Sequence, residues 1–364
     1  MRKRVQKKVL AALSLVVLSI GALTGCGSEE AESSKGQQKV DAQATDSTKE
    51  DSASDQEEKS SEEVVIRVGD FATAIFNDEF KVAYQKGIFD EIFKDDHVKI
   101  EVNPFENGPA ANEAFLAGQL DIVNGIGDQP IIIGIGNDVK TTIVAGAAKQ
   151  AANIGIITPK DKGIQSVEDL KGKTIGVFIG TYVHKSLIGI LGDAGVSEDE
   201  VEIVNITSTS DADAAFENGD IDAYLSSSAY HIHKNVDEGD FIKIADCSKH
   251  PAFSYMVVAD DFIEKHADLL EKFIAALYEA EQWIAENLDD SYQVIADYSG
   301  MDVETVKWVN KDAQRTIVWD DEYESNLKKT YTFLHDYDMI TNELSDKEIE
   351  SHIDTSFVKK VTGK

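Results

Sequence analysis

The chain has 364 residues and a formal net charge of −32, with 67 acidic against 35 basic side chains. So negative a surface repels nucleic acid and anionic lipid, which excludes phosphate-backbone binding and membrane adhesion through a basic patch. Two cysteines exclude a disulfide-rich scaffold and a zinc site built from cysteines. Apolar residues make up 42% of the chain, enough for a core, and the length suggests one large or two ordinary domains.

The first 25 residues have the pattern of a secretory signal peptide. Residues 1–8 are basic, and residues 9–22 form an apolar run that is too short to span a bilayer comfortably. This run ends in Leu23-Thr24-Gly25-Cys26, which resembles a bacterial lipobox. The resemblance implies that Cys26 becomes the N-terminus and the site of lipid attachment. An ordinary secretory signal followed by a chance cysteine is the alternative.

Residues 26–63 read as a disordered acidic tether. Residues 27–63 carry twelve acids and four lysines and almost no large apolar side chain. Such a segment cannot bury enough surface to offset its chain entropy. The tether predicts a folded domain held near a membrane surface.

The folded part alternates strand-like and helical runs. Short β-branched runs predict strands over residues 64–68, 98–102, 121–123, 141–145, 154–158, 174–178, 201–206, 221–225, 241–245 and 254–259. Helices are expected between them, at 79–93, 109–117, 181–193 and 211–218, and then in series at 262–287, 291–298, 302–312 and 321–337. Most strands are apolar on both faces, as parallel strands covered by helices are. The chain is therefore predicted to be an α/β protein.

An internal repeat points to a ligand cleft. Residues 114–121 (AFLAGQLD) match residues 215–222 (AFENGDID), each reading as a helix end, a glycine at the C′ position and the start of a strand. A polar loop follows each strand, at 127–130 and 226–230. Two similar units with loops at strand carboxyl ends predict a cleft between them, although two common helix–strand joints can also match by coincidence.

An ordered set of short motifs between residue 64 and about residue 288 resembles the solute-binding proteins of ABC importers for aliphatic sulfonates, taurine and nitrate, including the related pyrimidine-precursor binders. The motifs are IRVG at 66–69, FENGPA at 105–110, GDQP at 127–130, SVEDLKGK at 166–173, GTYVH at 180–184 and FIEKH at 262–266.

The resemblance implies a two-lobe periplasmic-binding-protein-like fold of type II with two crossovers, near residues 148–153 and 250–255. Lobe one is then 64–149 plus 254–364, with extra C-terminal helices, and lobe two is 150–253. The implied function is the capture of a small organic anion and its delivery to an ABC permease and its ATPase. We expect a lipid-anchored monomer at the extracytoplasmic face of a bacterial membrane, with no cofactor and no metal.

Two helix starts are the predicted anion site. Asn107-Gly108-Pro109 fits a helix N-terminus, with Gly108 near the cap and Pro109 at the first helical position. Gly180-Thr181 offers the same feature from lobe two. Helix N-termini supply N–H groups and a positive dipole end at contact range, while distant charges are screened beyond about 8–10 Å. Plain helix capping is the alternative role for both motifs.

Further candidate ligand contacts surround these helix starts. They are Phe71, Asp128, Gln129, Tyr182, His184, Ser227 and Tyr230, with Phe76 as a second aromatic candidate. His184 can donate a hydrogen bond to the anion or pack in the core, and Asp128 can cap a helix or face the ligand. Residues 227–229 (SSA) stand where many relatives carry Trp-Asp/Ala-Pro, so a larger or differently shaped pocket is expected there.

Other functions are weighed against binding. Relatives on this fold include enzymes with a Cys nucleophile, but Cys247 follows a predicted strand and reads as a small buried residue. A pyrimidine-precursor or nitrate binder and a sensor-coupled receptor are further alternatives. His231 and His233 lack a partner at metal-ligand spacing and are expected on a solvated helix surface.

Overall fold

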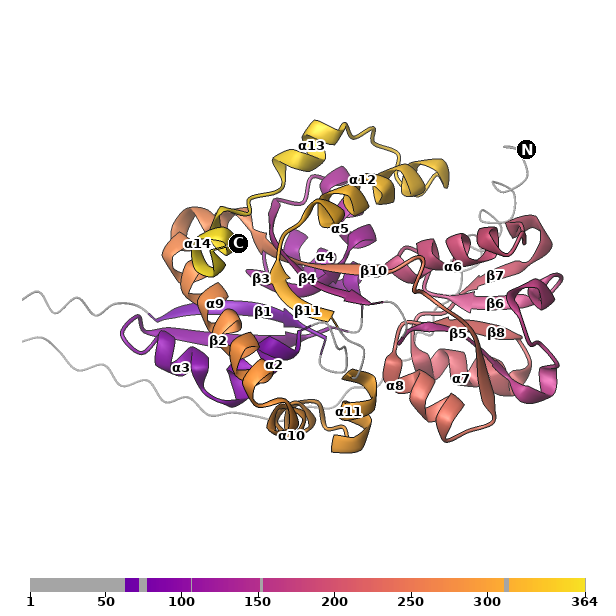
Figure 1. Cartoon of the computed structure of the whole chain (residues 1–364). Helices are drawn as coiled ribbons and strands as arrows, with labels where there is room; N and C mark the ends of the chain where they lie inside the picture. The colour runs from indigo at the N-terminus through magenta and orange to yellow at the C-terminus, as the bar shows by residue number, and fades with distance from the viewer. Residues whose placement is uncertain (1–62, 72–76, 106, 151–152, 311–313, 364) are drawn as a thin grey trace, which may run out of the picture. The chain divides into compact units, whose positions relative to one another are not determined.

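Two mixed β-sheets organise the part of the chain that the computed structural model describes, residues 63–71, 77–105, 107–150, 153–310 and 314–363 (Figure 1). The first sheet has six strands in the order β11-β4-β10-β3-β1-β2, and the second has five in the order β7-β6-β8-β5-β9. The predicted signal peptide, Cys26 and the predicted tether as far as residue 62 lie outside the described residues. The two sheets with their helices are the predicted α/β architecture.

The first sheet consists of β1 (Val64–Asp70), β2 (Val98–Pro104), β3 (Ile122–Gly127), β4 (Thr141–Gln150), β10 (Ala252–Ala259) and β11 (Gln314–Val318). The second sheet consists of β5 (Gly155–Pro159), β6 (Thr174–Val177), β7 (Glu202–Asn205), β8 (Ala223–Ser226) and β9 (Phe241–Asp246). The expectation of parallel strands holds only in part. Pairs β1–β2, β1–β3, β6–β7 and β6–β8 are parallel, whereas β10 runs antiparallel to β3 and β4, β11 to β4, and β5 to β8 and β9.

The helices before residue 250 are α2 (Asp78–Gln85), α3 (Ile88–Ile92), α4 (Gly108–Leu116), α5 (Asp128–Gly136), α6 (Tyr182–Asp193), α7 (Thr209–Asn218) and α8 (Ala229–Ile232). Those after it are α9 (Asp260–Glu286), α10 (Leu288–Ser299), α11 (Val303–Asn310), α12 (Asp321–Asp336), α13 (Asp346–Ser351) and α14 (Ser356–Thr362). Strand β11 and helices α13 and α14 were not predicted from the sequence. Among the described residues, no helix combines the length and apolarity that a membrane span requires.

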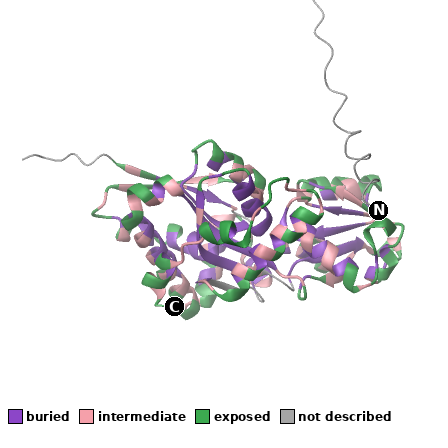
Figure 2. Cartoon of the chain, turned by 90° about the horizontal axis from the view of Figure 1, so that it is seen from above, coloured by how far each residue is buried: buried purple, intermediate pink, exposed green. Residues whose placement is uncertain are grey.

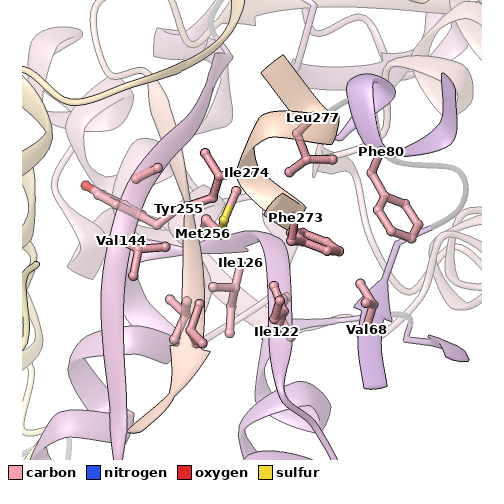
Figure 3. Close-up of a cluster of buried hydrophobic side chains, with 14 of the residues drawn as sticks. Val68, Phe80, Ile122, Ile126, Val144, Tyr255, Met256, Phe273, Ile274 and Leu277 are labelled. Atoms are coloured by element: carbon pink, nitrogen blue, oxygen red, sulfur yellow. The ribbon is translucent and has the colours of Figure 1, made fainter. Parts of the chain in front are cut away.

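The main core lies between the first sheet and helix α9. Phe273, Ile274 and Leu277 occupy one face of α9, as the helical spacing predicts. Figure 3 shows them against Ile122 of β3 and Met256 of β10. Burial is concentrated along the central strands of both sheets, while the edge strands β2, β7 and β9 and the outward helix faces are partly or fully exposed (Figure 2). Two separate hydrophobic clusters pack on the second sheet.

The internal repeat has the same local geometry in both copies. Gly118 and Gly219 each end a helical segment with a left-handed backbone, at φ of +65° and +76°. The aspartate three residues later accepts a backbone N–H from the neighbouring strand, Asp121 from Arg67 at 2.7 Å and Asp222 from Thr174 at 3.1 Å. Each copy therefore locks the next strand, β3 or β8, into its sheet.

The chain passes between the sheets twice, after β4 and after β9. The expected crossovers reach too far into the strands. Ala148 and Tyr255, at the ends of the expected ranges, lie within β4 and β10, where Ala148 pairs with Ser254. These strands stay paired as far as Gln150 and Ala252, so the first connection begins later than expected and the second ends earlier than expected.

Candidate functional site

A cavity of about 640 Å³ is lined from both sheets. From the first-sheet side it is lined by Phe71, Pro104, Phe105, Asn107, Gly108, Gly125, Gly127 and Pro130. From the second-sheet side it is lined by Phe178, Thr181, Tyr182, Thr207, Ser208, Thr209, Ser210, Ser227, Ser228, Ala229 and Tyr230. None of these described lining residues carries a charge. Five are aromatic, and seven carry an aliphatic hydroxyl group.

Four helices of eight or more residues, α4, α5, α6 and α7, start at this cavity, and for α5 the lining includes its N-cap Gly127 and Pro130 of its first turn. On α4, Asn107 is the N-cap and its side chain accepts the N–H of Ala110 at 3.0 Å. The cap thus lies one residue earlier than expected, with Gly108 first and Pro109 second in the helix. Pro109 has no N–H and is not among the lining residues, and the Asn107 side chain takes the N–H of Ala110, so the first turn of α4 presents few free donors.

Helix α6 begins at Tyr182 with Thr181 as its N-cap. The Thr181 hydroxyl donates to the carbonyl of Phe178 at 2.8 Å and makes no cap hydrogen bond. No side chain at the N-cap position therefore competes for the first-turn N–H groups of α6. Gly180 supports this turn with a left-handed backbone, φ +80°, but is not among the lining residues.

The helix start on α7 was missed by sequence reasoning as part of the site. Its N-cap Ser208 accepts the N–H of Asp211 at 3.0 Å, and Thr207, Thr209 and Ser210 join it in the cavity wall. The Ser-x-x-Asp spacing at 208–211 is the start signal that could have found it.

The two sides of the cavity approach each other closely at Gly127 and Tyr182. A Cβ atom on Gly127 would lie 2.7 Å from Cδ1 of the Tyr182 ring. Burial raises the pKa of the Tyr182 phenol, opposed by its hydrogen bond with Ser227, so the hydroxyl stays protonated at neutral pH. The parts of the cavity wall that come from the two sheets therefore meet at Gly127 and Tyr182.

Asp128 and Gln129 lie beneath the wall rather than in it. Both are fully buried at the start of α5. Asp128 is paired with Lys185 of α6 and accepts from Asn326 and Thr330 of α12, each at 2.7 Å. The amide of Gln129 has no hydrogen-bond partner among the described residues. Neither side chain lines the cavity, contrary to expectation.

His184 is also buried away from the cavity lining. Its ring packs edge-on against Phe333 and Tyr337, with centroids 5.5 and 6.1 Å away. Desolvation lowers the pKa of His184 to about 4, so the ring is neutral at pH 7. The geometry favours the packing alternative over a role beside the anion.

The cavity thus brings together seven of the predicted ligand residues: Phe71, Asn107, Gly108, Thr181, Tyr182, Ser227 and Tyr230. Their binding role stays a prediction. Phe76 lies outside the described residues. His231 is not solvated as expected but 3% exposed, and His233 stacks on Trp308 with ring centroids 4.5 Å apart. Within the described ranges, no group of three or more His, Cys, Asp or Glu side chains is arranged to hold a metal ion.

The chain resembles known solute-binding proteins in sequence. A putative aliphatic sulfonates-binding protein of Bacillus subtilis (strain 168) is 28% identical over 287 residues, covering 77% of this chain and 83% of that protein. The taurine-binding periplasmic protein of Escherichia coli (strain K12) is 30% identical over 203 residues, covering 54% and 61%.

Solved structures show the same fold. The alkanesulfonate-binding protein SsuA from Xanthomonas axonopodis pv. citri, bound to MOPS, aligns with a TM-score of 0.68 at 18% identity, over 80% of this chain and 98% of that one. The desulfurization enzyme DSZB aligns with a TM-score of 0.64 at 14% identity, over 82% and 99%. The two-lobe binding-protein fold is thus shared by binding proteins and at least one enzyme. The family profile described as NMT1/THI5 like matches residues 79–291, more than half of the sequence, and the chain belongs to the NMT1/THI5-like family.

Proposed function

We propose that the chain is the extracytoplasmic solute-binding component of an ABC importer. It captures a small organic anion, of the aliphatic sulfonate or taurine-like class, and delivers it to a membrane permease and its ATPase. The observation that carries the proposal is the cavity between the two sheets, whose described lining has four helix starts and no charged side chain. The names of the matched relatives support the sulfonate class.

Helix ends explain how so acidic a protein binds an anion. Backbone N–H groups and the positive end of the helix dipole act within the first turn, and neighbouring hydroxyl groups add donors. The aromatic side chains, among them Phe71, Phe105 and Phe178, supply an apolar surface for the body of the ligand. The described lining offers no carboxylate to an ammonium group, which favours a simple sulfonate over taurine.

We propose the two lobes as 64–149 plus 254–364 and 150–253. Ligand contacts that both lobes share stabilise the closed form, which the permease then recognises. The cavity supports this division, because its lining comes from both sheets. The protein works as a monomer held to the membrane by the lipid on Cys26. Incorporation of labelled fatty acid in the intact chain, lost in Cys26→Ser, tests the anchor.

The environment of Cys247, the one cysteine among the described residues, fits a binding role better than cysteine-based catalysis. Cys247 is fully buried and does not line the cavity. Burial raises the pKa of the Cys247 thiol to about 12, so it is not a thiolate at neutral pH. Cys247→Ser is expected to leave ligand binding intact, and loss of a ligand-converting activity in that variant would instead support an enzyme.

Isothermal titration of the folded chain with a ligand panel tests the proposed function. The panel contains butanesulfonate, MOPS, taurine, nitrate, a hydroxymethyl-pyrimidine and, as an uncharged control, butanol. We expect binding of a sulfonate, weaker binding of taurine and none of butanol. Binding of the pyrimidine or nitrate alone would reassign the ligand, and binding of none would contradict the sulfonate proposal.

A further inference from the structure

His231 lies in a continuous chain of hydrogen bonds behind the second-sheet side of the cavity. Its Nε2 atom is 2.8 Å from Oδ1 of Asp213, and its Nδ1 atom is 3.1 Å from Oγ of Ser226. Ser226 Oγ in turn accepts the backbone N–H of Ser228 at 3.2 Å. The His231 ring is 3% exposed and packs edge-on against Tyr224, with centroids 5.7 Å apart.

The direction of each hydrogen bond follows from the chemistry of the groups. A carboxylate only accepts hydrogen bonds, so His231 Nε2 is protonated and its N–H donates to Asp213. In the neutral ring Nδ1 is then an acceptor, and Ser226 donates its hydroxyl proton to it. This leaves a lone pair of Ser226 Oγ for the N–H of Ser228. These three hydrogen bonds are mutually compatible when His231 is neutral.

This chain of hydrogen bonds ties two cavity-lining segments together. Asp213 belongs to α7, whose first residues line the cavity, while Ser226 ends β8 and His231 belongs to α8. Ser228 lies in the lining, and its own Oγ accepts the N–H of His231 at 3.2 Å. Ser226 itself is fully buried and outside the lining, so it is not placed to attack a ligand.

We infer that His231 is a positioning residue that fixes the start of α7 and the 226–230 segment relative to each other and so sets the shape of this cavity wall. The inference rests on the proposed function only in taking the cavity as the ligand site. Asp213 holds the ring in one tautomer. Ser226 Oγ bonds both the ring and the backbone N–H of Ser228, and so links the ring to the backbone of the cavity wall.

Protonation of His231 changes the chain of hydrogen bonds in a defined way. Nδ1 then donates to Ser226 Oγ, whose hydroxyl turns to the carbonyl of Ser228, 3.3 Å away. The groups facing the ring are Asp213 of α7, Tyr224 of β8 and Lys234 of the following π-helical turn. Desolvation lowers the pKa of His231, opposed by Asp213, so this change belongs to acidic pH.

Amide hydrogen exchange of the ligand-free chain tests the inference without knowing the ligand. His231→Phe keeps the ring but removes both hydrogen bonds, and Asp213→Leu alters a side chain that is 38% exposed and is the safer variant for folding. We expect protection of residues 226–232 at pH 8 to fall at least tenfold in both. His233→Phe, which keeps the stacking on Trp308, is the matched control and is expected to retain protection.

Two further readouts separate positioning from general stability. Asp213→Asn, whose amide oxygen still accepts from Nε2, is expected to restore protection. After correction for intrinsic rates, the wild-type protection changes as the pH is lowered below the ordinary histidine pKa of about 6.5, and His231→Phe loses this change. Unchanged protection in His231→Phe and Asp213→Leu, or an equal loss in His233→Phe, would overturn the inference. Titration with butanesulfonate reports separately on the proposed function, because exchange is measured without ligand.

Discussion

Asp128 and Lys185 form an ion pair that joins the two sheets. Asp128 starts α5 beside the first sheet and is fully buried, whereas Lys185 belongs to α6 beside the second sheet. The Lys185 ammonium also donates to Asn326 at 2.8 Å and Thr330 at 2.6 Å, both on α12. The Lys185 ammonium of α6 is thus bound by side chains of two helices on the first-sheet side, α5 and α12.

Removal of this cation should destabilise the fold. Lys185→Met leaves the buried Asp128 without a counter-charge, a change that costs about 3–5 kcal/mol of unfolding free energy. Lys162→Met is the control, because Lys162 and Asp222 both lie on the second-sheet side and both side chains are partly exposed, so about 0–1 kcal/mol is expected. Urea unfolding measures both. Equal losses in the two variants would show that Asp128 does not depend on Lys185.

His184 makes stability fall in acid. Its pKa of about 4 in the folded state lies below that of an unfolded histidine, about 6.5, so the unfolded chain takes up the proton first. The contribution is complete above pH 6.5 and is lost as the pH falls towards 4, amounting to about 2 kcal/mol by pH 5.

His184→Phe should remove this part of the pH dependence, since the phenyl ring keeps the packing on Phe333 and Tyr337. His335→Gln, at a half-exposed position, serves as the control. Unfolding free energies measured from pH 8 to pH 5 decide the matter. An unaltered pH profile in His184→Phe would mean that another group titrates.

Gly127 is required for the close approach of Tyr182. Gly127→Ala places a methyl group 2.7 Å from the tyrosine ring, and relief of such overpacking costs about 1–3 kcal/mol. Because Tyr182 lines the cavity, we expect butanesulfonate affinity to fall by about tenfold or more, measured by calorimetry. Gly192→Ala, with open space around its Cβ position on α6, should bind normally and gain up to about 1 kcal/mol of stability. Unchanged affinity in Gly127→Ala would contradict the role of this contact.

The buried amide of Gln129 should be a cost to stability. With no hydrogen-bond partner among the described residues, it forfeits about 1–3 kcal/mol of solvation, which Gln129→Leu avoids. We expect a stability gain of about 1 kcal/mol in thermal unfolding and no change in ligand affinity. Gln119→Leu, at an exposed position, should change neither the stability nor the ligand affinity. A loss of affinity in Gln129→Leu would restore this residue to the ligand contacts that the sequence predicted.

The sequence was sufficient for features that depend on local chemistry. The repeated glycine and aspartate at 118–121 and 219–222 predicted the helix ends and strand starts, because left-handed caps select glycine. Burial and strand direction depend on distant partners. The residues near Asp128 in the sequence do not indicate that it contacts Lys185, Asn326 and Thr330. Those near His184 likewise do not indicate its packing on Phe333 and Tyr337. Likewise, the antiparallel course of β10 follows from the return of the chain from the second sheet, which strand periodicity does not encode.

The antiparallel ladder between β4 and β10 makes the second sheet an excisable insert. Gln150 and Ala252 are cross-strand neighbours, so the segment between them leaves and re-enters the first sheet at one point. Replacing residues 151–251 with a short hairpin turn would join two ends that already pair. Conversely, the same site is where another domain can be grafted or the chain circularly permuted with both strands of the ladder preserved.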